Sequence, residues 1–197
     1  MRLARLVADL LATEPEARGL LALLVLVDAR RSARSTPDGG LILLADQDRS
    51  LWNRERIAEG HALVRACLRR NAPGPYQIQA AIQAVHCDAR TAAATDWPQI
   101  VALYDQLMQL TPTHVVALHR AVAVAEVNGP AASLALVDGL PLAEHHRFHA
   151  IRADLLRRLG RLHEAANAYD AAIARTTNAI EHEFLRRSRR SLEPARG

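Results

Sequence analysis

Lysine is absent from this sequence, and aromatic residues make up only 4% of it. All 25 basic residues are arginines, and they are scattered among 21 acidic residues along the chain. The net charge of +4 therefore does not mark a basic stripe of the kind that contacts phosphates. We expect no direct, sequence-specific DNA binding by this segment.

Long hydrophobic runs and cysteine motifs are missing as well. The apolar run Leu20 to Val27 is far shorter than the roughly 20 residues that span a bilayer. Acidic residues interrupt the segment after Arg2 and Arg5 that would otherwise resemble a signal peptide. We therefore expect a soluble, cytoplasmic protein without a membrane partner. Cys67 and Cys87 lack CxxC or metal-ligand spacing, which predicts two buried thiols.

Alanine and leucine, which favour helices, dominate the sequence and predict an all-α fold. The stretch Thr95 to Pro130 reads as one complete helical hairpin, with Pro112 between its helices and Gly129 at the end of the second. Apolar residues of its first half recur at the spacing of one helix face. They are Trp97, Ile100, Val101, Tyr104, Leu107 and Met108.

The same stripe returns near the C-terminus, where Gly160, Ala165, Tyr169 and Ala172 match the tetratricopeptide pattern in register. Tyr104 and Tyr169 take the same place in their stripes, so we expect both rings to point inward. The unit between them is degenerate, because residues 138–141 contain Asp, Gly and Pro. These repeats predict antiparallel helical hairpins stacked as a tetratricopeptide-like right-handed solenoid.

A helical N-terminal subdomain, residues 1–72, is expected to precede the repeats at 73–197, the two forming one continuous domain. It begins with a short amphipathic helix that ends near Thr13, which with Glu16 predicts a capping box. The next helix is apolar on all faces and should be the buried centre of this half, running to about Ser35. Residues 41–44 are the only candidate strand, and without a partner we expect extended chain.

The polar tract that precedes Trp52 is the strongest local anomaly in the chain. It consists of Asp46, Gln47, Asp48 and Arg49, and it precedes a predicted helix. Its acids can hold an ion or a partner's arginine. We favour a structural role, because polar groups in one short loop usually satisfy each other and nearby helix ends. Trp52, Trp97, Tyr104 and Tyr169 are assigned structural roles too.

The residue types of catalytic and metal sites occur, but in unsuitable arrangements. His145 and His149 have metal-binding spacing, with His146 beside them, yet no carboxylate or HExxH context accompanies them. The run 86–88, His-Cys-Asp, cannot form a triad, because neighbouring helical residues point about 100° apart. We therefore expect no enzyme activity, no cofactor and no metal.

The concave groove is the usual working surface of a helical solenoid. Five residues are expected to face it, and we call them the groove candidates: His119, Glu126, Arg147, Asp154 and Arg157. Their mixed charges suit an extended acidic or mixed-charge protein segment better than a small apolar ligand. The alternative is that they are solvated surface.

Five stretches together resemble a known family more specifically than the repeat pattern does. They are DQDRSLWNRERIAEG (46–60), GPYQIQAAIQAVH (74–86), TDWPQIVALYDQL (95–107), VVALHRAVAVAEVNGP (115–130) and RADLLRRLGR (152–161). They resemble the tetratricopeptide-like C-terminal extension of a subgroup of bacterial extracytoplasmic-function sigma factors. The sigma domains that precede the extension in that subgroup have no counterpart in these residues.

The resemblance implies a non-enzymatic regulatory domain that modulates promoter-specific transcription initiation. Its implied partners are the sigma domains of the same factor, RNA polymerase or another protein. The alternative is a free-standing, tetratricopeptide-like adaptor that binds peptides. Sigma-domain sequence directly upstream of residue 1 would decide between the two.

Overall fold

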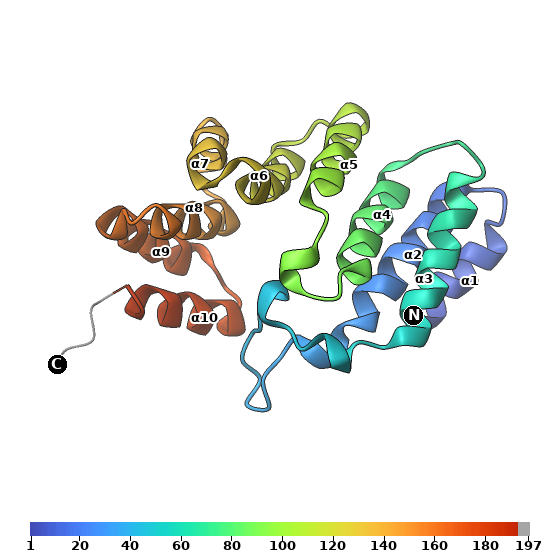
Figure 1. Cartoon of the computed structure of the whole chain (residues 1–197), viewed down its shortest axis with the longest axis horizontal. Coiled ribbons are helices and arrows are strands. Elements are labelled where there is room, and N and C mark those ends of the chain that lie inside the picture. Colours follow the sequence, from blue (N-terminus) through green and yellow to red (C-terminus); the bar gives the residue numbers. More distant parts are fainter. Residues whose placement is uncertain (193–197) are drawn as a thin grey trace. The chain divides into compact units, whose positions relative to one another are not determined.

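The computed structural model describes residues 1–192, which contain ten α-helices and no β-strand (Figure 1). The all-α prediction is confirmed, and no helix among these residues is long and apolar enough to cross a membrane. The helices are α1 (Arg2–Leu10), α2 (Pro15–Ala29), α3 (Arg54–Leu68), α4 (Pro75–Asp88), α5 (Trp97–Leu110), α6 (His114–Asn128), α7 (Pro130–Asp138), α8 (His146–Arg158), α9 (Leu162–Arg175) and α10 (Ala179–Arg190).

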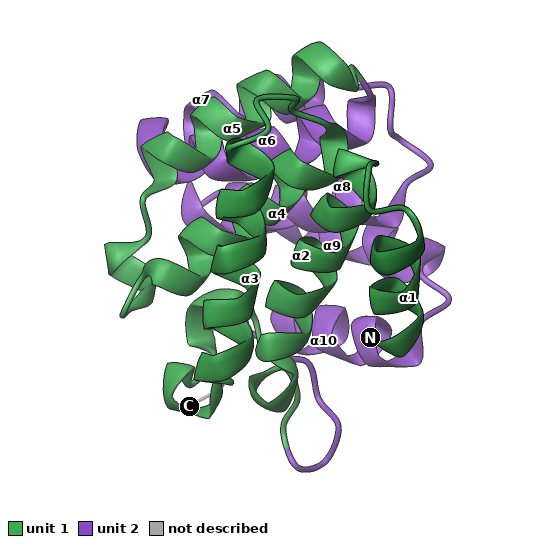
Figure 2. Cartoon of the chain, turned by 90° about the vertical axis from the view of Figure 1, so that its right-hand side faces the viewer, with its two compact units in different colours: residues 1–36, 42–112 green, residues 37–41, 113–197 purple. Residues whose placement is uncertain are grey.

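The chain divides into two compact units (Figure 2). Unit 1 comprises Met1–Thr36 and Ile42–Pro112, and unit 2 comprises Pro37–Leu41 and Thr113–Gly197, of which 193–197 lie outside the described residues. We predicted an N-terminal subdomain of residues 1–72 continuous with repeats at 73–197; in the structure α4 packs on α2 and α3, within unit 1. The hairpin predicted from Thr95 to Pro130 is divided at Pro112, since α5 packs on α4 and α6 packs on α7.

Helix α2 is the centre of unit 1, as predicted, and it contacts α1, α3 and α4. Its Ala22, Val25 and Leu26 are fully buried. Gly60 of α3 permits this close packing, because a Cβ there would lie 2.5 Å from the Leu26 side chain. The helix ends at Ala29, earlier than predicted, and a short 3-10 turn, η1 (Arg31–Ala33), follows it.

The capping box predicted from Thr13 and Glu16 is wrong. Helix α2 begins at Pro15 without a side-chain cap. The Glu16 carboxylate instead accepts hydrogen bonds from the backbone N–H groups of Tyr76 (2.8 Å) and Gln77 (3.3 Å), at the start of α4. Glu16 therefore caps a helix that is distant in sequence, which local spacing cannot reveal.

Residues 41–44, the candidate strand, are not in a strand. The backbone N–H of Ile42 donates to the carbonyl of Arg34 at 2.9 Å, and the 3-10 turn η2 (Leu44–Asp46) follows. Leu43 has extended backbone angles (φ −64°, ψ 151°), in agreement with the predicted extended chain, which ends where η2 begins.

Unit 2 consists of consecutive helices that pack side by side, α6 on α7, α7 on α8, α8 on α9 and α9 on α10. Gly129 and Gly160 adopt positive φ values of 85° and 73° in the turns before α7 and α9. Such backbone is open to glycine at little steric cost. Helix α7 is short and ends at Asp138, where the sequence predicted the middle unit to break. Leu118, Val137 and Leu156 are fully buried in the core of this unit.

Candidate functional site

Two groove candidates pair with each other on α8. The Arg157 guanidinium donates to the Asp154 carboxylate at 2.6 Å, with both side chains nearly half exposed. The Tyr169 hydroxyl of α9 lies within hydrogen-bonding reach of Arg157, and burial raises the pKa of Tyr169. Tyr169 is 5% exposed, so it anchors this exposed pair to the core of unit 2.

Two other groove candidates lie in a cluster rich in histidine. The Arg147 guanidinium is 3.8 Å from the Glu181 carboxylate of α10, which is also 3.1 Å from Nε2 of His146. Burial, and then Arg147 and His145, lower the pKa of His119. His119 and Arg147 both lie in unit 2, and burial disfavours the charged form of the His119 ring.

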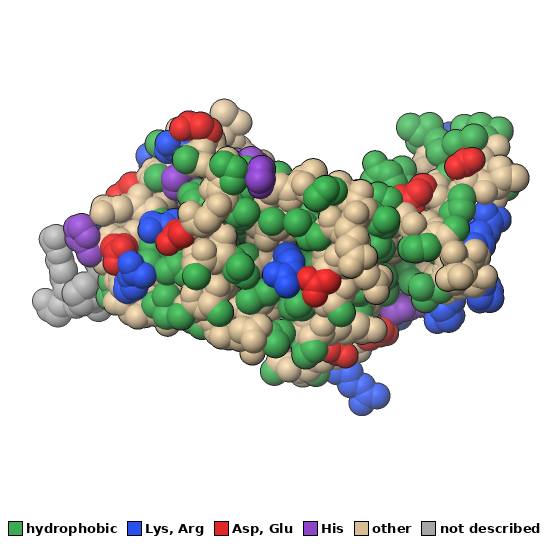
Figure 3. All heavy atoms as spheres, turned by 90° about the horizontal axis from the view of Figure 1, so that it is seen from above, with side chains coloured by type: hydrophobic (Ala, Val, Ile, Leu, Met, Phe, Trp, Pro, Cys, Tyr) green, Lys and Arg blue, Asp and Glu red, His purple; other side chains and the backbone are tan. Residues whose placement is uncertain are grey.

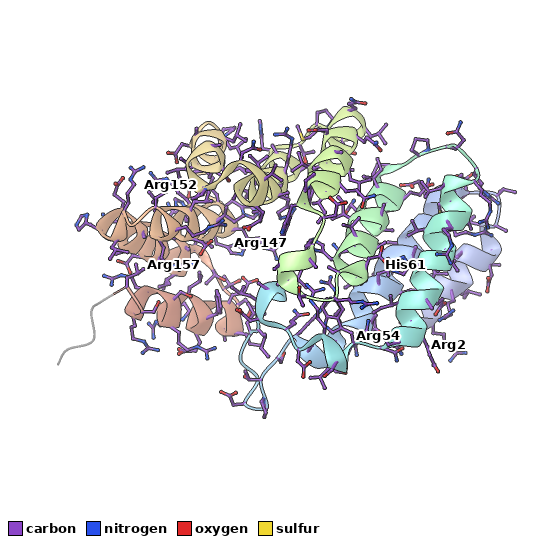
Figure 4. The ribbon with its side chains drawn as sticks, viewed as in Figure 1. Arg2, Arg54, His61, Arg147, Arg152 and Arg157 are labelled. Atoms are coloured by element: carbon purple, nitrogen blue, oxygen red, sulfur yellow. The ribbon has the colours of Figure 1, made fainter. Side chains whose placement is uncertain are left out.

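Glu126, the fifth groove candidate, has a separate partner. Its carboxylate accepts from Arg158 at 2.6 Å. The five candidates thus lie at three places in unit 2, and within residues 1–192 four of them, Glu126, Arg147, Asp154 and Arg157, have an ion-pair partner. Figure 4 labels Arg147, Arg152 and Arg157 along α8, and Figure 3 shows arginine and acidic side chains lying beside one another among apolar ones. A partner that binds here would have to replace these ion pairs or form additional contacts with the same side chains.

The Asp46 to Trp52 tract has internal partners, as its structural interpretation predicts. The Asp48 carboxylate accepts from the backbone N–H of Ser50 at 2.8 Å and caps the 3-10 turn η3 (Arg49–Leu51). Gln47 donates weakly to the carbonyl of Ile42, at 3.4 Å. Asp46 is exposed.

Arg49 makes the principal contacts of the tract. Its Nη1 donates to the carbonyls of His86 (2.9 Å) and Ala89 (2.8 Å), at the C-terminal end of α4. Its guanidinium also lies over the Trp52 ring, 4.4 Å from the centroid. Trp52 is 3% exposed, so Arg49 ties the tract to both the core and the end of α4.

The other aromatic residues assigned structural roles differ in burial. Trp97 is half-buried and its ring meets the His86 imidazole edge-on, with centroids 5.3 Å apart. Tyr104 is half-buried too, whereas Tyr169 is buried. The two tyrosines therefore differ in environment despite their matching sequence positions.

The described residues hold no metal site and no assembled triad. No group of three or more His, Cys, Asp or Glu side chains within residues 1–192 is placed to hold a metal ion. The His149 ring shares a hydrogen bond with the carbonyl of Ala143 at 2.6 Å. His86 is buried, while Asp88 lies 3.2 Å from His61. Cys67 and Cys87 are buried free thiols, as predicted, and burial raises the pKa of both.

A cleft of about 220 Å³ lies between α3, α4 and α5. Cys67, Ile78 and Leu103 are among its mostly apolar lining residues. Pockets for drug-sized ligands usually measure about 300 to 1,000 Å³, so this cleft lies below that range.

Sequence reasoning missed a cluster of arginines around Trp52. Arg30, at the end of α2, lies with its guanidinium 5.7 Å from the Trp52 centroid, and it donates to the Gln83 side chain of α4. Arg34 donates to the carbonyl of Val27 at 2.6 Å. We call Arg30, Arg34 and Arg49 the arginine cluster. Arg30 and Arg49 meet at Trp52, and burial, together with the charges of Arg34 and Arg49, lowers the pKa of Arg30, which places Arg34 close to Arg30. No local sequence pattern predicts this arrangement.

Comparison with known proteins leaves the activity open. The family of unknown function DUF6596 matches residues 1–68, which cover α1 to α3. Uncharacterized protein R00370 of Rhizobium meliloti (strain 1021) is 47% identical over 188 residues, which cover 94% of this chain and 44% of that protein. The chain thus spans less than half the length of the relative it matches. No solved structure matches.

Proposed function

We propose that this chain is a non-enzymatic regulatory and protein-interaction domain of an extracytoplasmic-function sigma factor. The five stretches that resemble the C-terminal extension of such factors carry the proposal. One of them, residues 46–60, supplies Arg49 and Trp52, which join η3 to the core of unit 1 and to α4. The relative from Rhizobium meliloti extends well beyond the match, as expected where such a domain is joined to others.

The finer fold is part of the proposal. The pairs α6–α7 and α8–α9 have the short turns and close contacts expected of tetratricopeptide-like hairpins. Ala165 and Ala172 are fully buried on α9, where small residues allow helices to approach closely. Stacked hairpins of this kind form a right-handed solenoid whose groove holds extended protein segments.

The partners that fit this function are the sigma domains of the same factor, RNA polymerase or both, in the cytoplasm. The groove candidates supply exposed charges of both signs, Arg147 and Arg157 against Glu126 and Asp154. Complementary charge at a protein surface sets partner choice and association rate more than raw affinity. We therefore assign partner selection to these residues.

In vitro transcription tests this function. The reading frame ahead of residue 1 is sequenced first, and the factor is then compared with and without residues 113–192, the helices of unit 2 that carry the groove candidates. We expect promoter-specific transcription to fall on deletion, with the promoter-reading domains still folded. Unchanged transcription would contradict the proposal. A reading frame without sigma domains would favour the alternative, a free-standing tetratricopeptide-like adaptor that binds peptides.

A further inference from the structure

The arginine cluster of unit 1 contains three guanidinium groups and no carboxylate. Within residues 1–192, Arg30, Arg34 and Arg49 bond only to a Gln83 amide, backbone carbonyls and the Trp52 ring. Other arginines of this unit have acidic partners, such as Arg5 with Glu59 at 2.5 Å. Buried charges in proteins are usually paired, so an unpaired cluster needs an explanation.

Helix ends neutralise part of this charge. Arg34 bonds to a carbonyl in the last turn of α2, and Arg49 bonds to two at the end of α4. A helix C-terminus is equivalent to about half a negative charge. The two helix ends therefore supply roughly one negative charge, whereas the guanidinium groups carry three positive charges. Most of the positive charge therefore remains without a counter-charge.

Within the part of the chain that the structure describes, three buried polar atoms of Arg30 and its neighbours also lack hydrogen-bond partners. They are Nε of Arg30, Nε1 of Trp52 and Nδ1 of His86. All three residues are less than one-tenth exposed. The Arg30 guanidinium packs over the Trp52 ring, while Arg34 and Arg49 are only half-buried. Arg34 and Arg49 are therefore partly accessible from solvent, whereas Arg30 is not.

We propose that the arginine cluster binds a carboxylate side chain of an acidic segment on a protein partner. This inference rests on the proposed function, because it names the chemistry of one contact with the partner. Guanidinium groups match carboxylates with paired, charge-assisted hydrogen bonds. Phosphate is less suitable, because phosphate sites usually use helix N-termini and converging backbone N–H groups, whereas α2 and α4 both end here.

Trp52 provides the readout. In a Trp97→Phe background it is the only tryptophan, and two guanidinium groups lie over its ring. The probes are a capped tetraglutamate peptide, the matching tetraglutamine peptide and inorganic phosphate, titrated at constant low ionic strength. We expect tetraglutamate to change the Trp52 fluorescence saturably, and tetraglutamine to leave it unchanged.

Arg34→Gln should weaken tetraglutamate binding about tenfold, since it removes a charged hydrogen-bond donor. Arg34→Lys keeps the charge and loses the forked geometry, and it should weaken binding less. Arg31→Gln is the matched control, because Arg31 is exposed, lies nearby and already pairs with Asp28 at 2.9 Å. Circular dichroism melting checks that each variant folds.

Three results would overturn the inference. They are no saturable response to tetraglutamate, an equal loss of binding in Arg31→Gln, or tighter binding of phosphate than of tetraglutamate. The experiment is independent of transcription. The 113–192 deletion leaves unit 1 and its arginine cluster intact. Tetraglutamate binding combined with unchanged transcription after this deletion would refute the proposed function and leave the site standing. Reduced transcription combined with no tetraglutamate binding would support the function and refute the site.

Discussion

In unit 1 both ends of α4 are capped by residues from other parts of the chain, whereas in unit 2 helices α6 and α10 are capped by the residue just before them. Glu16 caps the start of α4 and Arg49 binds its end. Thr113 and Asn178 accept from the first turns of α6 and α10. The ends of α4 therefore depend on tertiary polar contacts, whereas the starts of α6 and α10 depend on local signals, as do those of α3 and α5 at Asn53 and Asp96.

The largest expected effects come from removing one buried aromatic ring in each unit. Trp52→Ala should destabilise the protein by about 3 to 5 kcal/mol, and Tyr169→Ala by a similar amount, because each leaves a cavity. Amide hydrogen exchange shows which helices lose stability in each variant. We expect protection to fall most in α2 and α4 for Trp52, and in α8 and α9 for Tyr169. The reverse pattern would show that the cores are wrongly assigned.

Lowering the pH should reduce the free energy of unfolding, because His86 of unit 1 binds a proton less readily in the folded protein than in the unfolded chain. Burial, with Arg30 and Arg49, lowers the pKa of His86 from 6.5 to about 4. The unfolded chain takes up this proton first, so the stabilisation is complete above pH 6.5 and is lost as the pH falls towards 4. The loss reaches about 3 kcal/mol at about 1.4 kcal/mol per pKa unit.

Urea unfolding at about pH 7 and about pH 4.5 gives the free energy of unfolding at each pH, and the difference between the two values contains most of this loss. His86→Gln should remove much of the pH dependence. His163→Gln is the control, because His163 is exposed on α9 and should leave the dependence intact. Equal behaviour of the two variants would rule out His86 as the cause.

Removing a distant cap should cost more than removing a local one. Glu16→Ala leaves the first N–H groups of α4 unpaired and also breaks the 2.9 Å bond from the Gln77 side chain. We expect a loss of about 1 to 2 kcal/mol, against about 1 kcal/mol for Asn178→Ala at α10. Chemical denaturation compares them, with Glu14→Ala as a control, since Glu14 makes no side-chain cap bond. A larger loss at Asn178 would reverse the comparison.

The smallest effect is expected at a surface ion pair of unit 2. Arg161 and Glu164 lie 2.6 Å apart and both side chains are nearly half exposed. Exposed pairs contribute little to stability, because water and salt screen their charges. The double change Arg161→Gln and Glu164→Gln should therefore move the melting temperature only slightly. A shift as large as that of Glu16→Ala would mean that such pairs support the repeat.

Local patterns predicted the helices well and the tertiary contacts poorly. The apolar stripes located α5 and α9, and Asp138 and Gly139 correctly marked the end of α7. Glu16 was assigned to its own helix, because the groups that it caps lie 61 residues or so away. The arginine cluster and the division at Pro112 were missed for the same reason. Each depends on which helices meet, and periodicity within one helix does not contain that information.

The regulatory role is tested most directly by transcription from the cognate promoter with Arg147→Glu and Arg157→Glu in the intact factor. The matched control is Arg2→Glu with Arg54→Glu, the same charge change at exposed positions of unit 1 (Figure 4). Reversed charges at a partner surface add repulsion to lost attraction, so we expect the first pair to reduce promoter-specific transcription and the control to leave it unchanged. Equal output from both variants and the unaltered factor would contradict the account.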